Sequence, residues 1–100
     1  MVLHGVAIPE ERLAAFCRRH GIARCALFGS ILTDRFRPES DIDMLVEFAP
    51  GRTPGLLAFA GMASELSEML GRPVDLRTPG DLSQYFRSTV LANARTLHAA

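Results

Sequence analysis

The chain has 100 residues, of which 48% are hydrophobic and 22% are charged, and its formal net charge is zero. This size suits one domain, residues 1–100, and the composition excludes a disordered chain. A neutral chain has no long-range attraction to nucleic acid, so stable direct nucleic-acid binding is not expected. No apolar stretch approaches the roughly 20 residues that a membrane span needs, and no signal peptide is recognised. We therefore expect a soluble, cytoplasmic protein.

The first half of the sequence predicts a helix followed by two strands. The helix begins at Pro9 with two acidic residues in its first turn, and Gly21 ends it. The apolar segment 24–28 is a short buried strand, and a short helix or turn follows over 30–36. Residues 41–48 alternate between hydrophobic and polar types, and this period of two is typical of a strand.

The second half continues the alternation of helices and strands. A loop over 49–55 precedes a long helix over 56–70, whose expected buried face consists of Leu56, Phe59, Ala60, Ala63, Leu66 and Leu70. A strand over 73–77 and a turn over 78–81 come next, before a final helix that carries Phe86, Val90, Ala94 and Leu97. The order α-β-α-β-α-β-α predicts an α/β or α+β fold, in which helices pack over a small sheet of three strands.

Two aspartates one residue apart indicate a metal site. Asp41 and Asp43 share one face of the predicted strand, with Cα atoms about 6.6 Å apart. Carboxylates about 5 Å apart repel each other by roughly 3 kcal/mol at an effective dielectric constant of 20, so we expect a cation beside them. Oxygen ligands of this kind suit Mg²⁺, with Mn²⁺ as an alternative. Asp75, facing the same way from a later strand, would let three acids hold two ions for in-line displacement at phosphorus.

The turn formed by Gly29 and Ser30 is predicted to hold phosphate. Glycine lets the backbone approach a phosphate closely, and Ser30 stands at a predicted helix start, where free N–H groups meet anions. Arg35 and Arg37 are near enough in sequence to add charge-assisted contacts, and Ser40 is assigned to the same nucleotide. Each motif alone is commonplace, but their order and the apolar strands around them together predict a site for metal and a nucleoside triphosphate.

These motifs carry a family resemblance. The segments Leu27-Phe28-Gly29-Ser30 and Ser40-Asp41-Ile42-Asp43 resemble the signature of the polymerase-beta nucleotidyltransferase superfamily. The chain is similar to its minimal prokaryotic members over about residues 8 to 98. The resemblance implies a mixed sheet, with Asp41, Asp43 and Asp75 as catalytic metal ligands and Gly29 and Ser30 on the triphosphate of ATP or another NTP. It also implies an antitoxin that adds AMP to a tyrosine of a cognate HEPN-type toxin. A homo-oligomer is compatible with these expectations.

Two other functions compete with this hypothesis. Many relatives have an arginine where Thr33 stands, and its loss would weaken the hold on the triphosphate. A catalytically degenerate module that neutralises the toxin by contact is therefore the main alternative. Transfer of a nucleotide to a small molecule ranks third among the hypotheses, because no domain that would bind such an acceptor is expected. The leading hypothesis remains a transferase in which Asp41 and Asp43 bind both metal ions and Asp75 favours ionisation of the acceptor hydroxyl.

Overall fold

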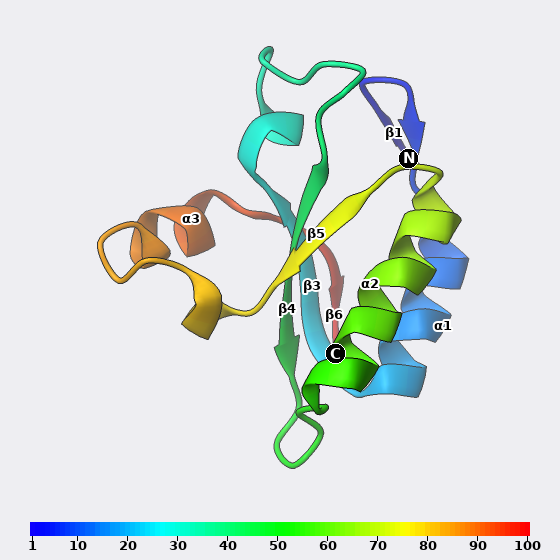
Figure 1. The fold of residues 1–100 in the computed structure, drawn as a ribbon, viewed down its shortest axis with the longest axis vertical. Helices are drawn as coiled ribbons and strands as arrows, with labels where there is room; N and C mark the ends of the chain where they lie inside the picture. The colour runs from blue at the N-terminus through cyan, green and yellow to red at the C-terminus, as the bar shows by residue number, and fades with distance from the viewer.

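The computed structural model describes residues 1–100 and contains three helices, six strands and two short 3₁₀ turns (Figure 1). The helices are α1 (Glu10–His20), α2 (Leu56–Leu70) and α3 (Arg87–Asn93). The strands are β1 (Val2–Leu3), β2 (Val6–Ala7), β3 (Ile22–Phe28), β4 (Ile42–Phe48), β5 (Val74–Arg77) and β6 (Arg95–Ala99). The 3₁₀ turns are η1 (Gly29–Leu32) and η2 (Pro79–Asp81).

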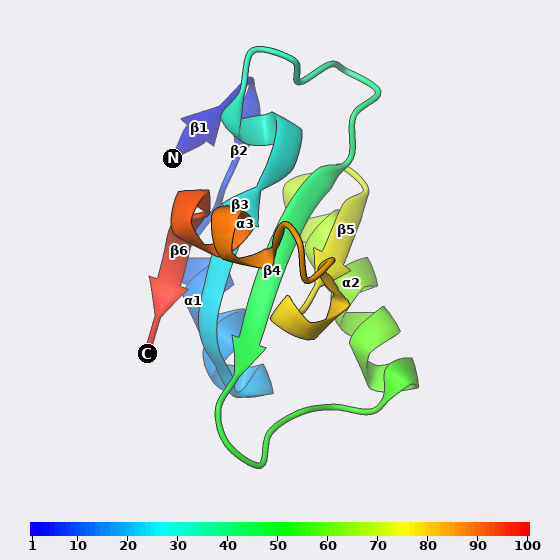
Figure 2. The same ribbon diagram turned by 90° about the vertical axis from the view of Figure 1, so that its left-hand side faces the viewer.

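Four of the strands form one mixed sheet in the order β5-β4-β3-β6. β3 is antiparallel to both β4 and β6, whereas β4 and β5 are parallel. The helices α1 and α2 cover one face of this sheet, and α3 stands on the opposite side as a projecting arm (Figures 1 and 2). The prediction of an α/β fold with a mixed sheet is confirmed.

The hydrophobic core lies between the sheet and the two long helices. α1 contributes Leu13, Phe16 and Cys17, and its first and last turns carry acidic and basic residues that complement the helix dipole. Gly21 ends α1 in the left-handed conformation, with a φ of 67°. The sheet adds fully buried side chains from alternate positions of β3 and β4, among them Cys25, Leu27, Ile42, Met44 and Val46. None of the helices is long and apolar enough to cross a lipid bilayer.

The prediction of three strands is wrong. The final helix ends at Asn93, and residues 95–99 form the fourth strand, β6, which pairs with β3. The backbone groups of β3 on that side need hydrogen-bond partners, and an extended segment supplies them where a helix would not. The hairpin of β1 and β2 at the N-terminus was not predicted either.

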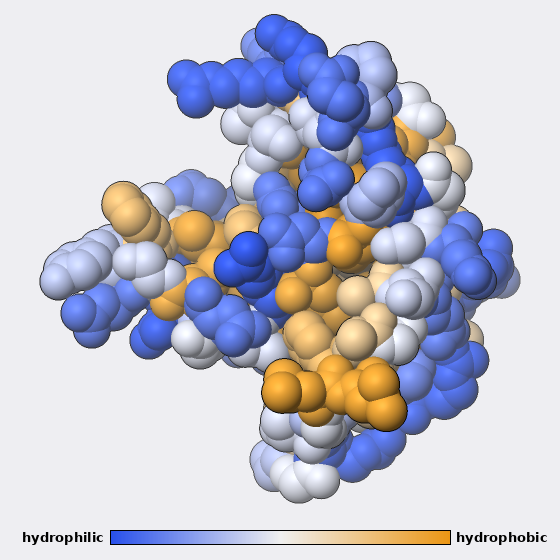
Figure 3. Space-filling view, viewed as in Figure 1, coloured by the Kyte–Doolittle hydropathy of each residue, from blue (hydrophilic) through white to orange (hydrophobic).

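The predicted buried face of α2 is partly wrong. Leu56 is 90% exposed, as is its neighbour Leu57 at 89%, and Met62 instead enters the core with Leu66 and Leu70. The spacing of four residues between these three side chains places them on one face of the helix. The first turn of α2 therefore leaves hydrophobic surface facing solvent (Figure 3).

Candidate active site

Two of the predicted acids meet on the face of the sheet opposite the core. Ile42 and Met44 are buried in the core, so Asp43 between them points to the other face. The strand register places Asp43 beside Phe28 of β3 on one side and beside Asp75 of β5 on the other. Asp41 lies just before β4 and is exposed. The centre of the site is therefore the pair formed by Asp43 and Asp75.

Gly29 packs directly against the Asp43 carboxylate. Its φ is 76°, in the left-handed region, and a Cβ atom at this position would overlap the carboxylate of Asp43. Both features exclude a side chain. From the sequence, the absence of a side chain at position 29 was explained by the close approach of a phosphate. The structure shows that the Asp43 carboxylate already leaves no space for a side chain there. The loop that Gly29 begins, with Ser30 next, thus lies immediately beside the carboxylates.

The local environment disfavours the ionised form of Asp43. Burial is the largest cause that raises the pKa of this carboxyl above its ordinary value, and the negative charges of Asp75 and Asp41 raise it further. Arg77 and the backbone N–H of Ser30 lower the pKa by smaller amounts. A cation bound at this position would therefore favour the ionised form of Asp43.

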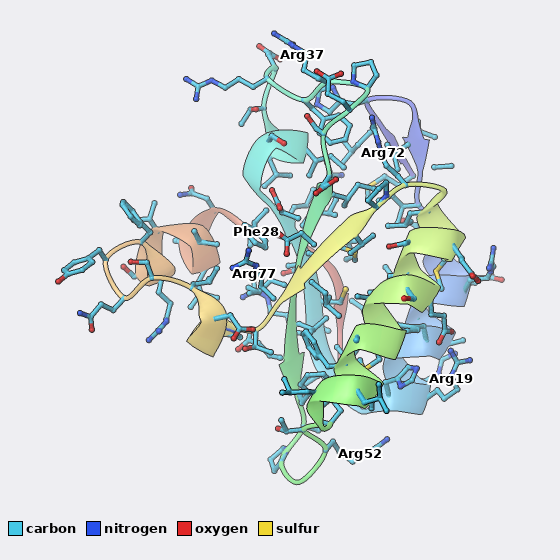
Figure 4. The ribbon with its side chains drawn as sticks, viewed as in Figure 1. Arg19, Phe28, Arg37, Arg52, Arg72 and Arg77 are labelled. Atoms are coloured by element: carbon cyan, nitrogen blue, oxygen red, sulfur yellow. The ribbon has the colours of Figure 1, made fainter.

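Arg77 is a member of the site that sequence reasoning missed. Its Nε and Nη2 atoms donate to Oδ1 and Oδ2 of Asp75 at 3.0 and 3.2 Å. The two residues are two positions apart on β5, so their side chains leave the same face of the strand. That spacing is the signal in the sequence that would have identified the pair. Figure 4 shows Arg77 near the middle of the sheet, on the side from which α3 projects.

The carboxylates fit a hard divalent cation, with one condition. No three His, Cys, Asp or Glu side chains lie close enough together in this structure to hold an ion as a group, and both oxygens of Asp75 face Arg77. Asp41 and Asp43 supply the oxygen ligands that Mg²⁺ prefers, and a cation there would offset the burial and the neighbouring negative charges that raise the pKa of Asp43. Asp75 would join them as a ligand in competition with Arg77, whose positive charge opposes a cation on the same carboxylate.

The other predicted nucleotide ligands lie in the loop before β4. The Ser40 hydroxyl accepts a hydrogen bond from the backbone N–H of Arg37 at 3.0 Å, and the Arg37 guanidinium donates to the Asp34 carbonyl at 3.3 Å. Arg37 stands at the outer end of this loop, away from Arg77 (Figure 4). The structure does not bring Arg37 to the acids, and its contact with the nucleotide stays a prediction.

Arg72 anchors this loop to the rest of the protein. Its Nη2 atom donates to the carbonyl of Arg37 at 2.9 Å and also bonds the carbonyl of Pro38. The guanidinium also lies 4.5 Å from the centre of the Phe36 ring. Sequence reasoning gave Arg72 no role, although it fixes the segment between the phosphate loop and Asp41.

Thr33 supports the end of η1. Its hydroxyl donates to the carbonyl of Ser30 at 2.9 Å and accepts from the N–H of Arg35 at 3.1 Å. A neutral side chain that closes its own turn therefore occupies the position where an arginine was expected from the resemblance.

A cleft of about 410 Å³ opens beside Gly29, between η1 and α3. Sequence reasoning did not predict it. Its lining consists of Phe28, Gly29, Leu32 and Thr33 on one side and Thr89, Val90 and Asn93 on the other.

Comparison with known families identifies the fold and its chemistry. The nucleotidyltransferase domain family matches residues 10–97, which include both acids of the sheet and the Gly29 loop. The chain belongs to this family. It is accordingly a nucleotidyltransferase with a nucleoside triphosphate as substrate, and the family assignment made from the motifs is confirmed.

Individual relatives of this nucleotidyltransferase are protein-modifying enzymes by name. It is 36% identical to "Putative protein adenylyltransferase MJ0435" of Methanocaldococcus jannaschii over 85% of this chain and 89% of that protein. It is 34% identical to the protein adenylyltransferase MntA of Thermococcus cleftensis over 73% of this chain and 72% of that protein. A solved complex of a tri-AMPylated Shewanella oneidensis HEPN toxin with its MNT antitoxin contains a chain with a TM-score of 0.65 and 25% identity, covering 91% of this chain and 70% of that one.

Proposed function

We propose that this nucleotidyltransferase moves AMP from ATP to a hydroxyl group of a partner protein. The observation that supports the proposal most is the pairing of Asp43 with Asp75 beside the loop of Gly29 and Ser30. Carboxylates next to a phosphate-binding turn are what in-line transfer at phosphorus needs. The names of the two archaeal relatives support adenylyl transfer to protein.

The residues of the chain divide the work between phosphate and acceptor. Gly29 and Ser30 would hold the β- and γ-phosphates through backbone N–H groups and the Ser30 hydroxyl. Asp41, Asp43 and Asp75 would bind Mg²⁺, and the bound ions would neutralise charge on the phosphates. Asp75 would favour ionisation of the acceptor hydroxyl by taking up its proton. The acceptor oxygen then bonds to the α-phosphorus, and the bond from that phosphorus to the bridging oxygen breaks to release pyrophosphate.

The proposed acceptor is a tyrosine of a HEPN-type toxin in the cytoplasm. The Shewanella complex supports this choice, because it joins an AMPylated HEPN toxin to an antitoxin of the same fold. In this proposal the chain is the antitoxin of a toxin–antitoxin pair. It acts by covalent modification of its partner.

A transfer assay tests the proposal directly. The protein is incubated with labelled ATP, Mg²⁺ and the HEPN-type protein encoded beside its gene. We expect at least one AMP on that protein by mass spectrometry. Asp43→Asn should lose nearly all transfer, because the acid acts where charge develops in the transition state. Asp34→Asn is the matched control, since Asp34 is an exposed loop acid that is not among the charges acting on Asp43, and it should keep full transfer. Absence of label with all four nucleoside triphosphates would reject the proposal.

A further inference from the structure

The cleft between η1 and α3 begins at the loop that we assign to the triphosphate. Gly29 belongs to both, because it starts η1 and also lines the cleft. We propose that this cleft holds the base and ribose of the nucleotide, and that Asn93 selects adenine there. The proposal rests on the function proposed above, since it requires the triphosphate to lie on Gly29 and Ser30.

The lining of the cleft suits an uncharged aromatic ring. None of its residues carries a charge, although Asp43 lies beside Phe28 in the sheet. Phe28, Leu32 and Val90 supply hydrophobic surface, with hydroxyl and amide groups between them. The volume of about 410 Å³ falls within the range of small-molecule sites, which are mostly apolar with a few placed polar groups. A phosphate group would find no cation in this cleft, whereas a base and ribose would find suitable partners.

Asn93 gives the cleft a polar group of fixed direction. Its Nδ2 atom donates to the backbone carbonyl of Thr89 at 2.9 Å, and this bond determines which way the amide faces. The Oδ1 atom and the second hydrogen of Nδ2 are then available as an acceptor beside a donor. Adenine complements this pair with an amino donor beside a ring-nitrogen acceptor, whereas guanine presents a carbonyl acceptor where adenine has its amino group.

Filling the cleft tests the location of the nucleoside. Val90→Trp should weaken the binding of Mg-ATP in calorimetric titration by about tenfold or more, because the indole would occupy the place of the base. Binding of Mg-tripolyphosphate, which has no base, should not change. Ser88→Trp is the matched control, because Ser88 is exposed on the same helix but outside the lining, and it should bind both ligands as the wild type does.

The two ligands separate the possible failures. If Val90→Trp binds Mg-ATP as tightly as the wild type, the nucleoside lies elsewhere and the cleft proposal is wrong. If the wild type itself binds neither Mg-ATP nor Mg-tripolyphosphate, the proposed function is wrong. An error in the place of the base alone would leave both ligands bound to the wild type. Retained binding of tripolyphosphate also shows that the variant is folded.

Asn93→Ala gives a measurement that does not depend on filling the cleft. We expect the ratio of Mg-ATP to Mg-GTP affinity to fall by about fivefold, the effect of one hydrogen bond, with tripolyphosphate binding unchanged. If Val90→Trp binds neither Mg-ATP nor Mg-tripolyphosphate, the affinity ratio of Asn93→Ala decides whether the base lies in the cleft. An unchanged ratio would overturn the assignment of Asn93 to the base.

Discussion

Asp43 is half-buried and lies beside two other acids and the backbone of Gly29. Its carboxylate prevents any side chain at Gly29, and its own charge is disfavoured by burial and by Asp75 and Asp41. A residue in such surroundings reduces the stability of the fold unless a ligand compensates. The same surroundings are typical of functional sites, where altered pKa values accompany chemistry.

Asp43→Asn should raise the melting temperature of the metal-free protein at neutral pH. The pKa of Asp43 is raised in the folded state, so its ionisation opposes folding above its ordinary value of 3.8, and the amide removes that opposition. The difference between variant and wild type should shrink as the pH falls through the folded pKa, and it should vanish only well below 3.8, where the acid is neutral in both states. Calorimetric melts of the two proteins over a pH series measure this difference.

Added Mg²⁺ with ATP should raise the melting temperature of the wild type far more than that of the Asp43→Asn variant. Equal ligand shifts in the two proteins would exclude Asp43 as a ligand.

Arg77→Gln should strengthen the binding of Mn²⁺. Arg77 occupies both oxygens of Asp75, so a cation that uses Asp75 must compete with it. The two side chains are 46% and 37% exposed, and a pair of this kind contributes at most about 1 kcal/mol, so the gain should be no more than about fivefold. Arg24→Gln is the control, because Arg24 pairs with Glu47 on the same sheet but not with the acids. Weaker Mn²⁺ binding by Arg77→Gln in calorimetric titration would show that Arg77 assists the cation instead of competing with it.

At the scale of elements, local pattern identified α1, β3, β4, α2 and β5, and it identified α3 apart from where that helix ends. Gly21 and Gly71 mark the ends of α1 and α2, where both adopt the left-handed conformation. The alternation over β4 and the apolar run of β3 are equally clear, because each strand is buried on its core face. These signals depend only on the residues within each segment and on which of its faces is buried. The sequence alone is therefore sufficient to predict these elements.

β6 was missed because its conformation depends on a partner distant in sequence. Ala94 and Leu97 continue the helical spacing from Val90, so the segment matches a helix by pattern. The backbone turns extended at Ala94, with φ −63° and ψ 141°, and the following residues pair with β3. Strand propensity is decided largely by such tertiary pairing, which a single sequence does not display.

At the scale of the whole molecule, the identity of the acids was predictable but their arrangement was not. The sequence placed Asp43 and Asp75 on one face, yet the parallel pairing that sets them side by side follows from the register of β4 and β5. The cleft beside Gly29 depends on α3, more than 50 residues further along the chain, packing near η1. Sites assembled from distant segments escape motif analysis for this reason.

Features of the whole molecule bear on whether the proposed antitoxin modifies its toxin or only binds it. Thr33 in place of an arginine and the pairing of Asp75 with Arg77 are the observations that favour a contact antitoxin. The pairing of Asp43 with Asp75 beside Gly29 favours the enzyme. Both hypotheses require binding to the partner, so binding alone does not separate them.

Protection of cells from the toxin separates the two hypotheses. Asp41→Asn and Asp43→Asn change charge inside the site, so we expect both variants still to bind the HEPN-type partner in a pull-down through surface elsewhere. If the protein acts by transfer, cells that express the toxin with either variant should stop growing, because the loss of transition-state stabilisation removes nearly all modification. Asp34→Asn should protect like the wild type. Full protection by Asp43→Asn, with no AMP found on the toxin, would instead establish neutralisation by contact.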